Sequence, residues 1–496
     1  HCYVQKVSPV QVIGGGRAGE ICPTLRLDLS LIAILSPLRA YRGNLASMSD
    51  ISEYKAATNR IFDDVKNELT KLVAIPSVSS ASRTEVEKSA GHLAQLFSNL
   101  GMETEVKTAP TPTGEEGMPA VIARKIVDPQ AKTVLLYAHH DVQPVGPVER
   151  WNTEPFVATE KNGRLYGRGT SDDGAGVMVH YGALLALGDK CPVNVTCFIE
   201  GEEEIGSPSF RNFIEKYRED LAADAIIVCD SDNWRVGEPA LTATLRGVAS
   251  MDVKVKVMNT ALHSGAFGGP VLDAVTVASL LLAKCFNPDG SLAVPGLGGS
   301  TSADVHYPEE LFKADAQVVE SFELAGKGDV AARLWNQPAL CVIGWDQRSR
   351  AESANALVPE TCLRLSLRTA PGTDSAECAQ ALSTFLKENA PFGAEVETEI
   401  LECGPSYQAQ SSEAEKDMKW ALSAAWDKDA VDIGCGGAIP MTADLAQVFP
   451  QADILITGVE DPATNAHSEN ESQDLGDLKN AITAEALFLA RLGGRV

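Results

Sequence analysis

Three clusters of acidic and histidine residues in this sequence could hold a metal ion. They are His139-His140-Asp141, Glu200-Gly201-Glu202-Glu203-Glu204 and Asp230-Ser231-Asp232. Imidazoles and carboxylates without any Cys are a ligand set typical of zinc- or manganese-type hydrolytic centres. Carboxylates crowded at one place repel one another at neutral pH, so protons or a cation must neutralise them. The residue types therefore indicate metal-assisted hydrolysis.

Each cluster follows directly after a short apolar run. Four such runs are typical of buried parallel strands, and they are 133–137, 195–199, 225–229 and 454–457. Helical patterns lie between them, for example at 176–187, so the sequence predicts an α/β domain with a mostly parallel sheet flanked by helices. In open α/β sheets, ligands bind beyond the carboxyl ends of the strands. We therefore expect the three clusters to share one edge of the sheet.

The segment 246–404 has a different pattern. Residues 251–257 alternate between apolar and polar side chains, as a half-exposed strand does. The remaining elements expected here are a helix at 272–286, strands at 339–345 and 362–367, a helix at 375–389 and a strand at 394–400. This β-α-β-β-α-β order is ferredoxin-like. We predict an inserted α+β domain at 246–404 that divides the catalytic domain into 48–245 and 405–496.

Composition and charge narrow the class of protein. The chain has 496 residues, with 42 Lys and Arg against 67 Asp and Glu, and its net charge is −25. This acidity argues against nucleic acid and anionic membranes as partners. No apolar run approaches the roughly 18 residues that a membrane span needs. Eleven scattered Cys without a C-x-x-C pair favour a reducing compartment, and we expect a cytoplasmic protein.

The first 47 residues differ from the rest. They carry five basic and two acidic residues, and a good helix pattern begins only after Met48. The glycines at 14–19 match G-x-G-x-x-G, but Pro23 interrupts the helix that a dinucleotide site requires. The apolar run 29–35 lacks the cleavage site of a signal peptide. We expect 1–47 to be a non-native or disordered leader.

Five ordered motifs then point to a known family. They are Ala138-His139-His140-Asp141-Val142-Gln143-Pro144, Gly167-Arg168-Gly169-Thr170-Ser171-Asp172-Asp173, Glu200-Gly201-Glu202-Glu203-Glu204-Ile205-Gly206-Ser207, Leu262-His263-Ser264-Gly265 and Ala466-His467-Ser468-Glu469-Asn470-Glu471. Together they resemble the M20 metallopeptidases, which include carnosinase-like dipeptidases, acetylornithine deacetylase and succinyl-diaminopimelate desuccinylase. The spelling of the third motif is most similar to the dipeptidase branch.

The resemblance implies a pair of divalent metal ions, Zn²⁺ in the first place, with Mn²⁺ or Co²⁺ as alternatives. Asp172 would bridge the two ions. His139 and Asp230 would complete one site, and Glu204 and His467 would complete the other.

The resemblance also implies two residues that assist the chemistry from beside the metals. Glu203, one residue before a ligand, would be the general base. Asp141 would orient the imidazole of His139, the kind of support that a ligating histidine usually has.

The substrate-binding residues that the resemblance implies lie later in the chain. His263 would reach the active site of the partner in a homodimer formed through the inserted domain, where it would stabilise the oxyanion. Arg368 would bind the substrate carboxylate. Gly437 and Ala438 belong to a segment, 436–440, that resembles the family's substrate-cradling loop.

Three positions depart from the family pattern. Gly174 stands where many members have Lys, Ala438 where Ser is usual, and Asp232 where Gly is common. None of them is an implied ligand or the base, so they bear on substrate preference rather than on the reaction.

The resulting interpretation is a dinuclear metal-dependent hydrolase that cleaves dipeptides or short peptides. An N-acyl-amino-acid deacylase, a desuccinylase or a carboxypeptidase of the same family is the alternative, since all would use the same metal core. A non-catalytic scaffold protein is a second alternative. It is disfavoured because such a relative should have lost a ligand or the base, and here every one of these positions is filled.

Overall fold

The computed structural model describes residues 48–437 and 440–496. The leader expected at 1–47 and the substrate-binding residue Ala438 lie outside this range. The larger unit of the chain contains all the elements described below.

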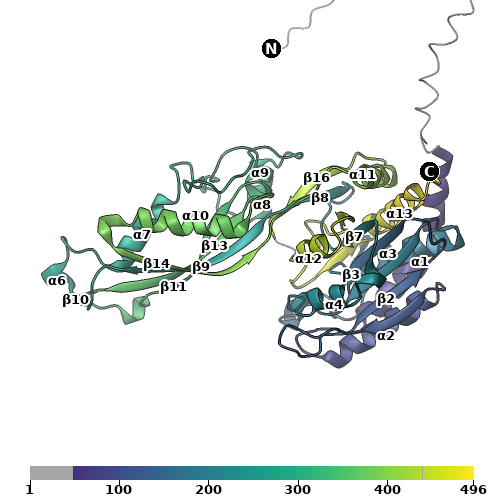
Figure 1. Cartoon of the computed structure of the whole chain (residues 1–496), viewed down its shortest axis with the longest axis horizontal. Helices are drawn as coiled ribbons and strands as arrows, with labels where there is room; N and C mark the ends of the chain where they lie inside the picture. The colour runs from purple at the N-terminus through teal and green to yellow at the C-terminus, as the bar shows by residue number, and fades with distance from the viewer. Residues whose placement is uncertain (1–47, 438–439) are drawn as a thin grey trace, which may run out of the picture. The chain divides into compact units, whose positions relative to one another are not determined.

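A six-stranded mixed sheet has the predicted ligand His139 at the end of one of its strands (Figure 1 shows the strands). Its strands, in spatial order, are β1 (Glu103–Lys107), β2 (Ala120–Lys125), β6 (Asn194–Glu200), β3 (Thr133–His139), β7 (Ala225–Cys229) and β17 (Asp453–Thr457). The last four run parallel and confirm the four strands predicted from the apolar runs. The antiparallel edge formed by β1 and β2 was not predicted, because β1 is short, charged and mostly exposed.

Helices cover both faces of this sheet. One face packs against α1 (Met48–Val73), α2 (Arg83–Ser98), α3 (Gly174–Leu187), α11 (Glu413–Trp426) and α13 (Leu475–Leu492). The other packs against α4 (Phe210–Lys216) and α12 (Pro440–Val448). Alternate side chains of β3 supply the two cores, since Leu136 belongs to the first and Tyr137 to the second.

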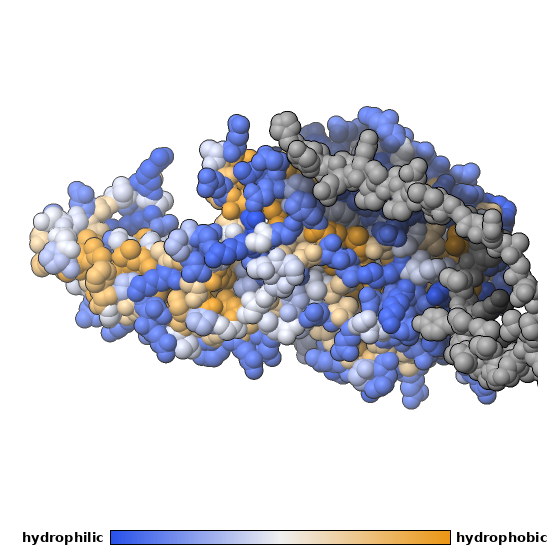
Figure 2. All heavy atoms as spheres, turned by 90° about the horizontal axis from the view of Figure 1, so that it is seen from above, coloured by the Kyte–Doolittle hydropathy of each residue, from blue (hydrophilic) through white to orange (hydrophobic). Residues whose placement is uncertain are grey.

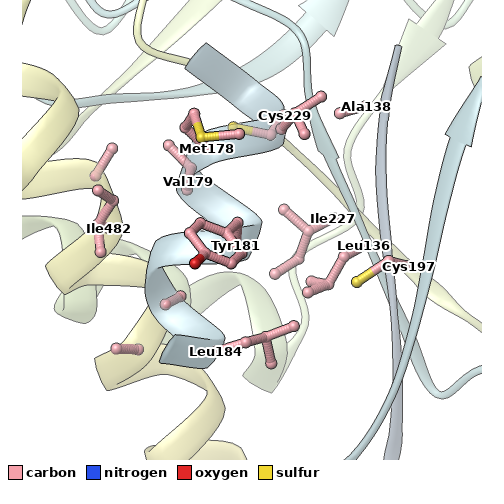
Figure 3. Packing of buried hydrophobic residues seen from close by; sticks show 14 of the residues in the cluster. Leu136, Ala138, Met178, Val179, Tyr181, Leu184, Cys197, Ile227, Cys229 and Ile482 are labelled. Carbon is pink, nitrogen blue, oxygen red and sulfur yellow. The ribbon is translucent and has the colours of Figure 1, made fainter. Parts of the chain in front are cut away.

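Helix α3 is apolar all round and is buried along almost its whole length. Its side chains Met178 and Leu184 lie among those of the sheet and of α13, as Figure 3 shows. The helix starts directly after the Asp172-Asp173 pair. A Cβ at Gly174 would lie 2.2 Å from the carbonyl oxygen of Gly169, so the lysine that many family members carry here could not be accommodated by this backbone.

A second sheet is formed by one continuous stretch of chain. Its antiparallel strands, in spatial order, are β11 (Ala339–Asp346), β13 (Glu360–Thr369), β9 (Gly247–Lys256) and β14 (Glu395–Gly404). Helices α7 (Ala274–Lys284) and α10 (Ser375–Glu388) pack against it and share a separate core. The chain order β9-α7-β11-β13-α10-β14 is the predicted β-α-β-β-α-β order.

Three smaller sheets complete the strands. They are β15 (Tyr407–Gln408) with β8 (Ala240–Leu245) and β16 (Val431–Cys435), β10 (Leu262–His263) with β12 (Ala356–Leu357), and β18 (Ser472–Asp474) with β5 (Arg164–Tyr166) and β4 (Thr159–Lys161). The remaining α-helices are α5 (Arg218–Leu221), α6 (Ser264–Phe267), α8 (Glu309–Asp315) and α9 (Val330–Trp335). No helix within the described residues combines the length and apolarity that crossing a membrane requires.

Candidate metal centre

The acidic and histidine clusters meet at the carboxyl ends of the parallel strands, as predicted. His139 is the last residue of β3 and lies opposite Glu200, the last residue of β6. Asp230 follows directly after β7, which pairs with β3 on the other side. Nε2 of the fully buried His139 lies 3.7 Å from Oδ1 of Asp230. Strand pairing alone therefore brings residues about 90 positions apart into contact.

Asp172 connects two histidines through its two carboxylate oxygens. Its Oδ1 lies 3.0 Å from Nε2 of His139, and its Oδ2 lies 2.9 Å from Nε2 of His467. The same Nε2 of His467 lies 3.3 Å from Oε2 of Glu204. Among the five predicted ligands, His139 thus lies near Asp230, His467 lies near Glu204, and Asp172 contacts both histidines. His139, Asp172 and Glu204 also lie close enough together to form one metal-ligand group.

The loop that presents Asp172 is held by Glu471, a residue that the sequence analysis did not single out. The buried carboxylate of Glu471 accepts hydrogen bonds from the backbone N–H groups of Gly169, Ser171 and Asp172, at 2.9, 2.9 and 3.0 Å. Nη1 of the buried Arg168 also donates to it, at 2.6 Å. Glu471 lies four residues after His467, so one segment supplies a ligand and fixes the loop of another. Its place in the fifth motif was the signal that could have identified it.

His467 lies on an irregular segment just before β18. Its φ angle is +60°, in the left-handed region that side chains other than glycine rarely adopt. Asn465 and Asn470, on either side, also have positive φ angles. Backbone held in such a conformation is common at functional sites, where the surrounding structure enforces it.

Without cations, the negative charge of the cluster keeps the imidazoles protonated. Burial would lower the pKa of His139, but the charge of Asp230 and hydrogen bonds to Asp141 and Asp172 outweigh it, so that this pKa is well above its ordinary value. Hydrogen bonds to Asp172 and Glu204 raise the pKa of His467 to about 10. In the absence of cations, both histidines thus favour their protonated forms.

The carboxylates are affected in the opposite direction. Burial raises the pKa of Glu204 and of Asp230, and the neighbouring charge of Asp172 adds to both. Burial, followed by the charges of Asp230 and Glu204, raises the pKa of Glu203 to about 8. Burial also acts on Asp172, but hydrogen bonds from His139 and His467 outweigh it and lower its pKa. Such a concentration of buried acids requires positive charge for its neutralisation.

The donor set fits divalent cations. Its described members offer imidazole nitrogens and carboxylate oxygens, which suit Zn²⁺, Mn²⁺ and Co²⁺. Oε1 of Glu204 is buried and has no hydrogen-bond partner among the described residues, although Oε2 accepts one from Nε2 of Gln143 at 2.7 Å. A buried carboxylate oxygen left without a partner is costly, and a bound cation would satisfy it.

Asp173 is also close enough to His139 and Asp230 for the three to form a metal-ligand group. However, its Oδ2 accepts a hydrogen bond from the backbone N–H of His139 at 3.0 Å, at the end of β3. We therefore assign it a supporting position and keep Asp172, which faces both histidines, as the bridging candidate.

Asp141 contacts both sides of the centre. Its carboxylate oxygens accept hydrogen bonds from the backbone N–H groups of Glu203 and Glu204, each at 3.1 Å. The imidazole of His139 contacts the backbone carbonyl of Asp141 at 3.0 Å and its Oδ1 at 3.4 Å. Asp141 thus contacts His139 and also the backbone of Glu203, the predicted base, and of Glu204, another predicted ligand. The neighbouring His140 is buried away from the centre, between Ser89 and the carbonyl of Pro119.

The predicted substrate-binding residues lie outside this cluster. His263 is an exposed residue of β10 whose Nδ1 accepts a hydrogen bond from the backbone N–H of Gly265 at 3.1 Å. Arg368 is half-buried on β13, and Gly437 follows β16. Among the described residues, no hydrogen bond or ion pair joins any of these three to the five predicted ligands. Their roles stay predictions.

Comparison with known proteins agrees with this geometry. Residues 135–491 match the family model "Peptidase family M20/M25/M40". A cysteinylglycine-S-conjugate dipeptidase of Corynebacterium striatum is 30% identical over 459 residues, which cover 89% of this chain and all of the relative. A Cys-Gly metallodipeptidase of Schizosaccharomyces pombe is 27% identical over 477 residues, covering 87% of this chain and 96% of the relative.

The fold agrees as well. A solved structure of the dipeptidase Dug1p from Saccharomyces cerevisiae superposes with a TM-score of 0.69 at 23% identity and covers 90% of this chain and 99% of that one. The chain belongs to peptidase family M20/M25/M40.

Proposed function

We propose that this protein is a dinuclear metallodipeptidase, which hydrolyses the peptide bond of dipeptides with free termini. The observation that carries the proposal is the position of the Asp172 carboxylate. One of its oxygens lies near His139 and the other lies near His467. Asp172, His139 and Asp230 would hold one cation, and Asp172, Glu204 and His467 the other. We propose Zn²⁺ as the native ion, with Mn²⁺ and Co²⁺ as the alternatives that the same ligands suit.

Bound cations would polarise the scissile carbonyl as Lewis acids and would lower the pKa of a water molecule. Glu203, fixed through its backbone to Asp141, takes the proton from the attacking water and passes it to the leaving amine. In the cation-free centre, burial raises the pKa of its carboxyl to about 8. His263 would donate a hydrogen bond to the oxyanion of the tetrahedral intermediate.

Acidic residues beside the proposed metal centre favour a substrate with a free ammonium group. Asp232, an acid where the family commonly has Gly, forms a β-bridge with Glu460. Burial, then the charge of Asp230, raises the pKa of Asp232 to about 6, and burial followed by Asp172 raises that of Glu460 well above its ordinary range. The ammonium group of a dipeptide would stabilise the charged forms of these two carboxyls, whereas an N-succinyl carboxylate would not. On this ground we propose that the site favours dipeptides over the deacylase and desuccinylase alternatives.

The names of the relatives suggest which dipeptides to test first. The relatives from C. striatum and S. pombe act on cysteinylglycine conjugates and Cys-Gly. We propose the same substrate class, a short dipeptide with a small C-terminal residue, for this chain. Arg368 would bind the carboxylate of that residue.

We also propose a homodimer formed through the four-stranded sheet. Its outer strands β11 and β14 carry exposed apolar side chains, among them Val342, Ile343 and Leu401. Figure 2 shows apolar side chains interspersed among hydrophilic ones on the face of the molecule that it presents. Exposed edge strands with apolar side chains readily pair with another chain. This arrangement would allow His263 of one subunit to serve the centre of its partner.

We further propose a cytoplasmic location. All nine Cys within the described residues are free thiols, which suits a reducing compartment.

One experiment tests the proposed activity and metal together. Metal-stripped protein is refilled with Zn²⁺, Mn²⁺ or Co²⁺ and assayed on Cys-Gly, β-Ala-His, N-acetyl and N-succinyl amino acids. The proposal expects metal-dependent cleavage of dipeptides at a kcat/KM at least tenfold above that for either acylated class. A preference for the acylated substrates would replace the dipeptidase assignment with the deacylase alternative.

A further inference from the structure

Two arginines, Arg246 and Arg368, lie near the junction between β8 and the four-stranded sheet. Figure 1 shows β8 and the strands of that sheet. Arg246 is the single residue between β8 and β9, and Arg368 lies on β13. Val248 of β9 pairs directly with Arg368, and Arg246 stands two residues before Val248. The two arginines therefore occupy diagonal positions on neighbouring segments. Neither forms an ion pair with an acid among the described residues.

Arg246 has an environment that lacks an anion. It is half-buried, and its Nη1 donates only a long hydrogen bond, 3.4 Å, to the carbonyl oxygen of Gln337. Its Nε is buried and has no partner among the described residues. Burial, and then the positive charge of Arg368, lowers the pKa of Arg246. A partly buried guanidinium beside a like charge is unfavourable, and a bound anion would relieve both costs.

Arg246 also touches the loop that resembles the family's substrate cradle. Its backbone N–H donates to the carbonyl oxygen of Cys435, the last residue of β16, at 3.2 Å. A Cβ built on Gly436 would lie 3.0 Å from Nη2 of Arg246. The guanidinium thus lies against the first residue of the 436–440 segment, where a side chain larger than hydrogen would meet it.

We propose that Arg246 and Arg368 together bind the C-terminal carboxylate of the substrate. The family resemblance implies that role for Arg368 alone. Two guanidinium groups offer more donors than one carboxylate needs, so each arginine can bind one oxygen and fix its orientation. The inference rests on the proposed function, because it takes the ligand to be a peptide with a free C-terminus.

The test compares a dipeptide with the same dipeptide amidated at its C-terminus. Arg246→Gln should lower kcat/KM for the free acid about 10- to 100-fold, mainly through KM, because a hydrogen bond to a charged group is lost. It should change kcat/KM for the amide by less than about threefold, since the amide carries no charge to pair. The preference for the acid should therefore fall at least tenfold, and Arg246→Lys should restore part of it.

Arg364→Gln is the matched control. Arg364 lies on the same strand, four residues before Arg368, but its Nε and Nη2 already bind Asp252 at 2.6 and 2.8 Å. Its replacement should leave the preference for the acid unchanged. Equal losses on acid and amide in Arg246→Gln would overturn the inference, because they would mean that Arg246 only supports the junction of β8 and β9.

A binding measurement separates this inference from the proposed function. In a Glu203→Gln background, Kd for the dipeptide and for its amide can be measured with and without Arg246→Gln. If the wild-type chain preferred N-acyl amino acids, the proposed function would fail. The same two Kd measurements, made with an N-acyl amino acid and its amide, would then still show whether Arg246 binds the substrate carboxylate. An unchanged ratio of acid to amide Kd would refute the role of Arg246 with either ligand.

Discussion

Oδ1 of Asp141 accepts a hydrogen bond from the backbone N–H of Glu203 at 3.1 Å. Through this contact a fully buried carboxylate fixes the segment that carries the proposed base. Asp141→Asn keeps the shape but places an amide where two N–H donors need acceptors. We expect kcat to fall about 10- to 100-fold, the usual effect of losing such support. Steady-state kinetics at saturating metal measures it, and activity within twofold of wild type would contradict the positioning role.

Replacing Glu471 should destabilise the fold and the centre together. Glu471→Gln leaves the buried Arg168 without its counter-charge and turns an amide toward three backbone donors. We expect a loss of about 3–5 kcal/mol in the free energy of unfolding, measured by urea denaturation. Glu469→Gln, the same change two residues earlier beside the exposed Arg150, is the control and should cost less than about 0.5 kcal/mol. Equal effects of the two variants would rule out the special role of Glu471.

Metal binding should release protons at neutral pH. The pKa of His467 is raised to about 10 in the cation-free centre, so its imidazole is protonated at pH 7.5, whereas a ligating imidazole must be neutral. Metal affinity should therefore rise with pH up to about 10 and fall as the solution is acidified. Titration calorimetry in buffers of different ionisation enthalpy counts the protons.

We expect at least one proton released per chain and fewer in His467→Gln. His306→Gln is the control, since the exposed His306 pairs with Asp329 and lies outside the predicted ligand set. Metal binding without proton release in the wild-type chain would contradict this prediction, because the imidazole of His467 would then have lost no proton.

Mixed dimers of two variants can test whether the proposed base and the proposed oxyanion donor of one active site come from different chains. Glu203→Gln should retain metal and lose at least about a thousandfold in kcat, since it removes the proton acceptor. His263→Ala should lose activity as well. Dimers formed from one chain of each kind should regain activity, because one of their two centres combines an intact Glu203 with an intact His263. Verified mixed dimers that stay inactive would place His263 in its own subunit's centre.

The parallel core of the fold could be predicted from the sequence because its strands are local apolar runs. The same reasoning located His139, Glu204 and Asp230, since each lies at the end of such a strand or within a few residues after it. It could not find Glu471 or Arg246, whose importance comes from contacts with residues distant in the chain. Nor could it show that the carboxylate of Asp141 faces the backbone of Glu203, because that contact depends on the turn after β6.

The central claim is a pair of cations bridged by Asp172, and counting bound metal tests it most directly. Elemental analysis after reconstitution should give two ions per wild-type chain and less than one in Asp172→Asn. Asp173→Asn is the control, because its amide oxygen can still accept the N–H of His139, and it should keep both ions. A wild-type chain that binds no metal, or an Asp172→Asn chain that retains two ions, would contradict the account.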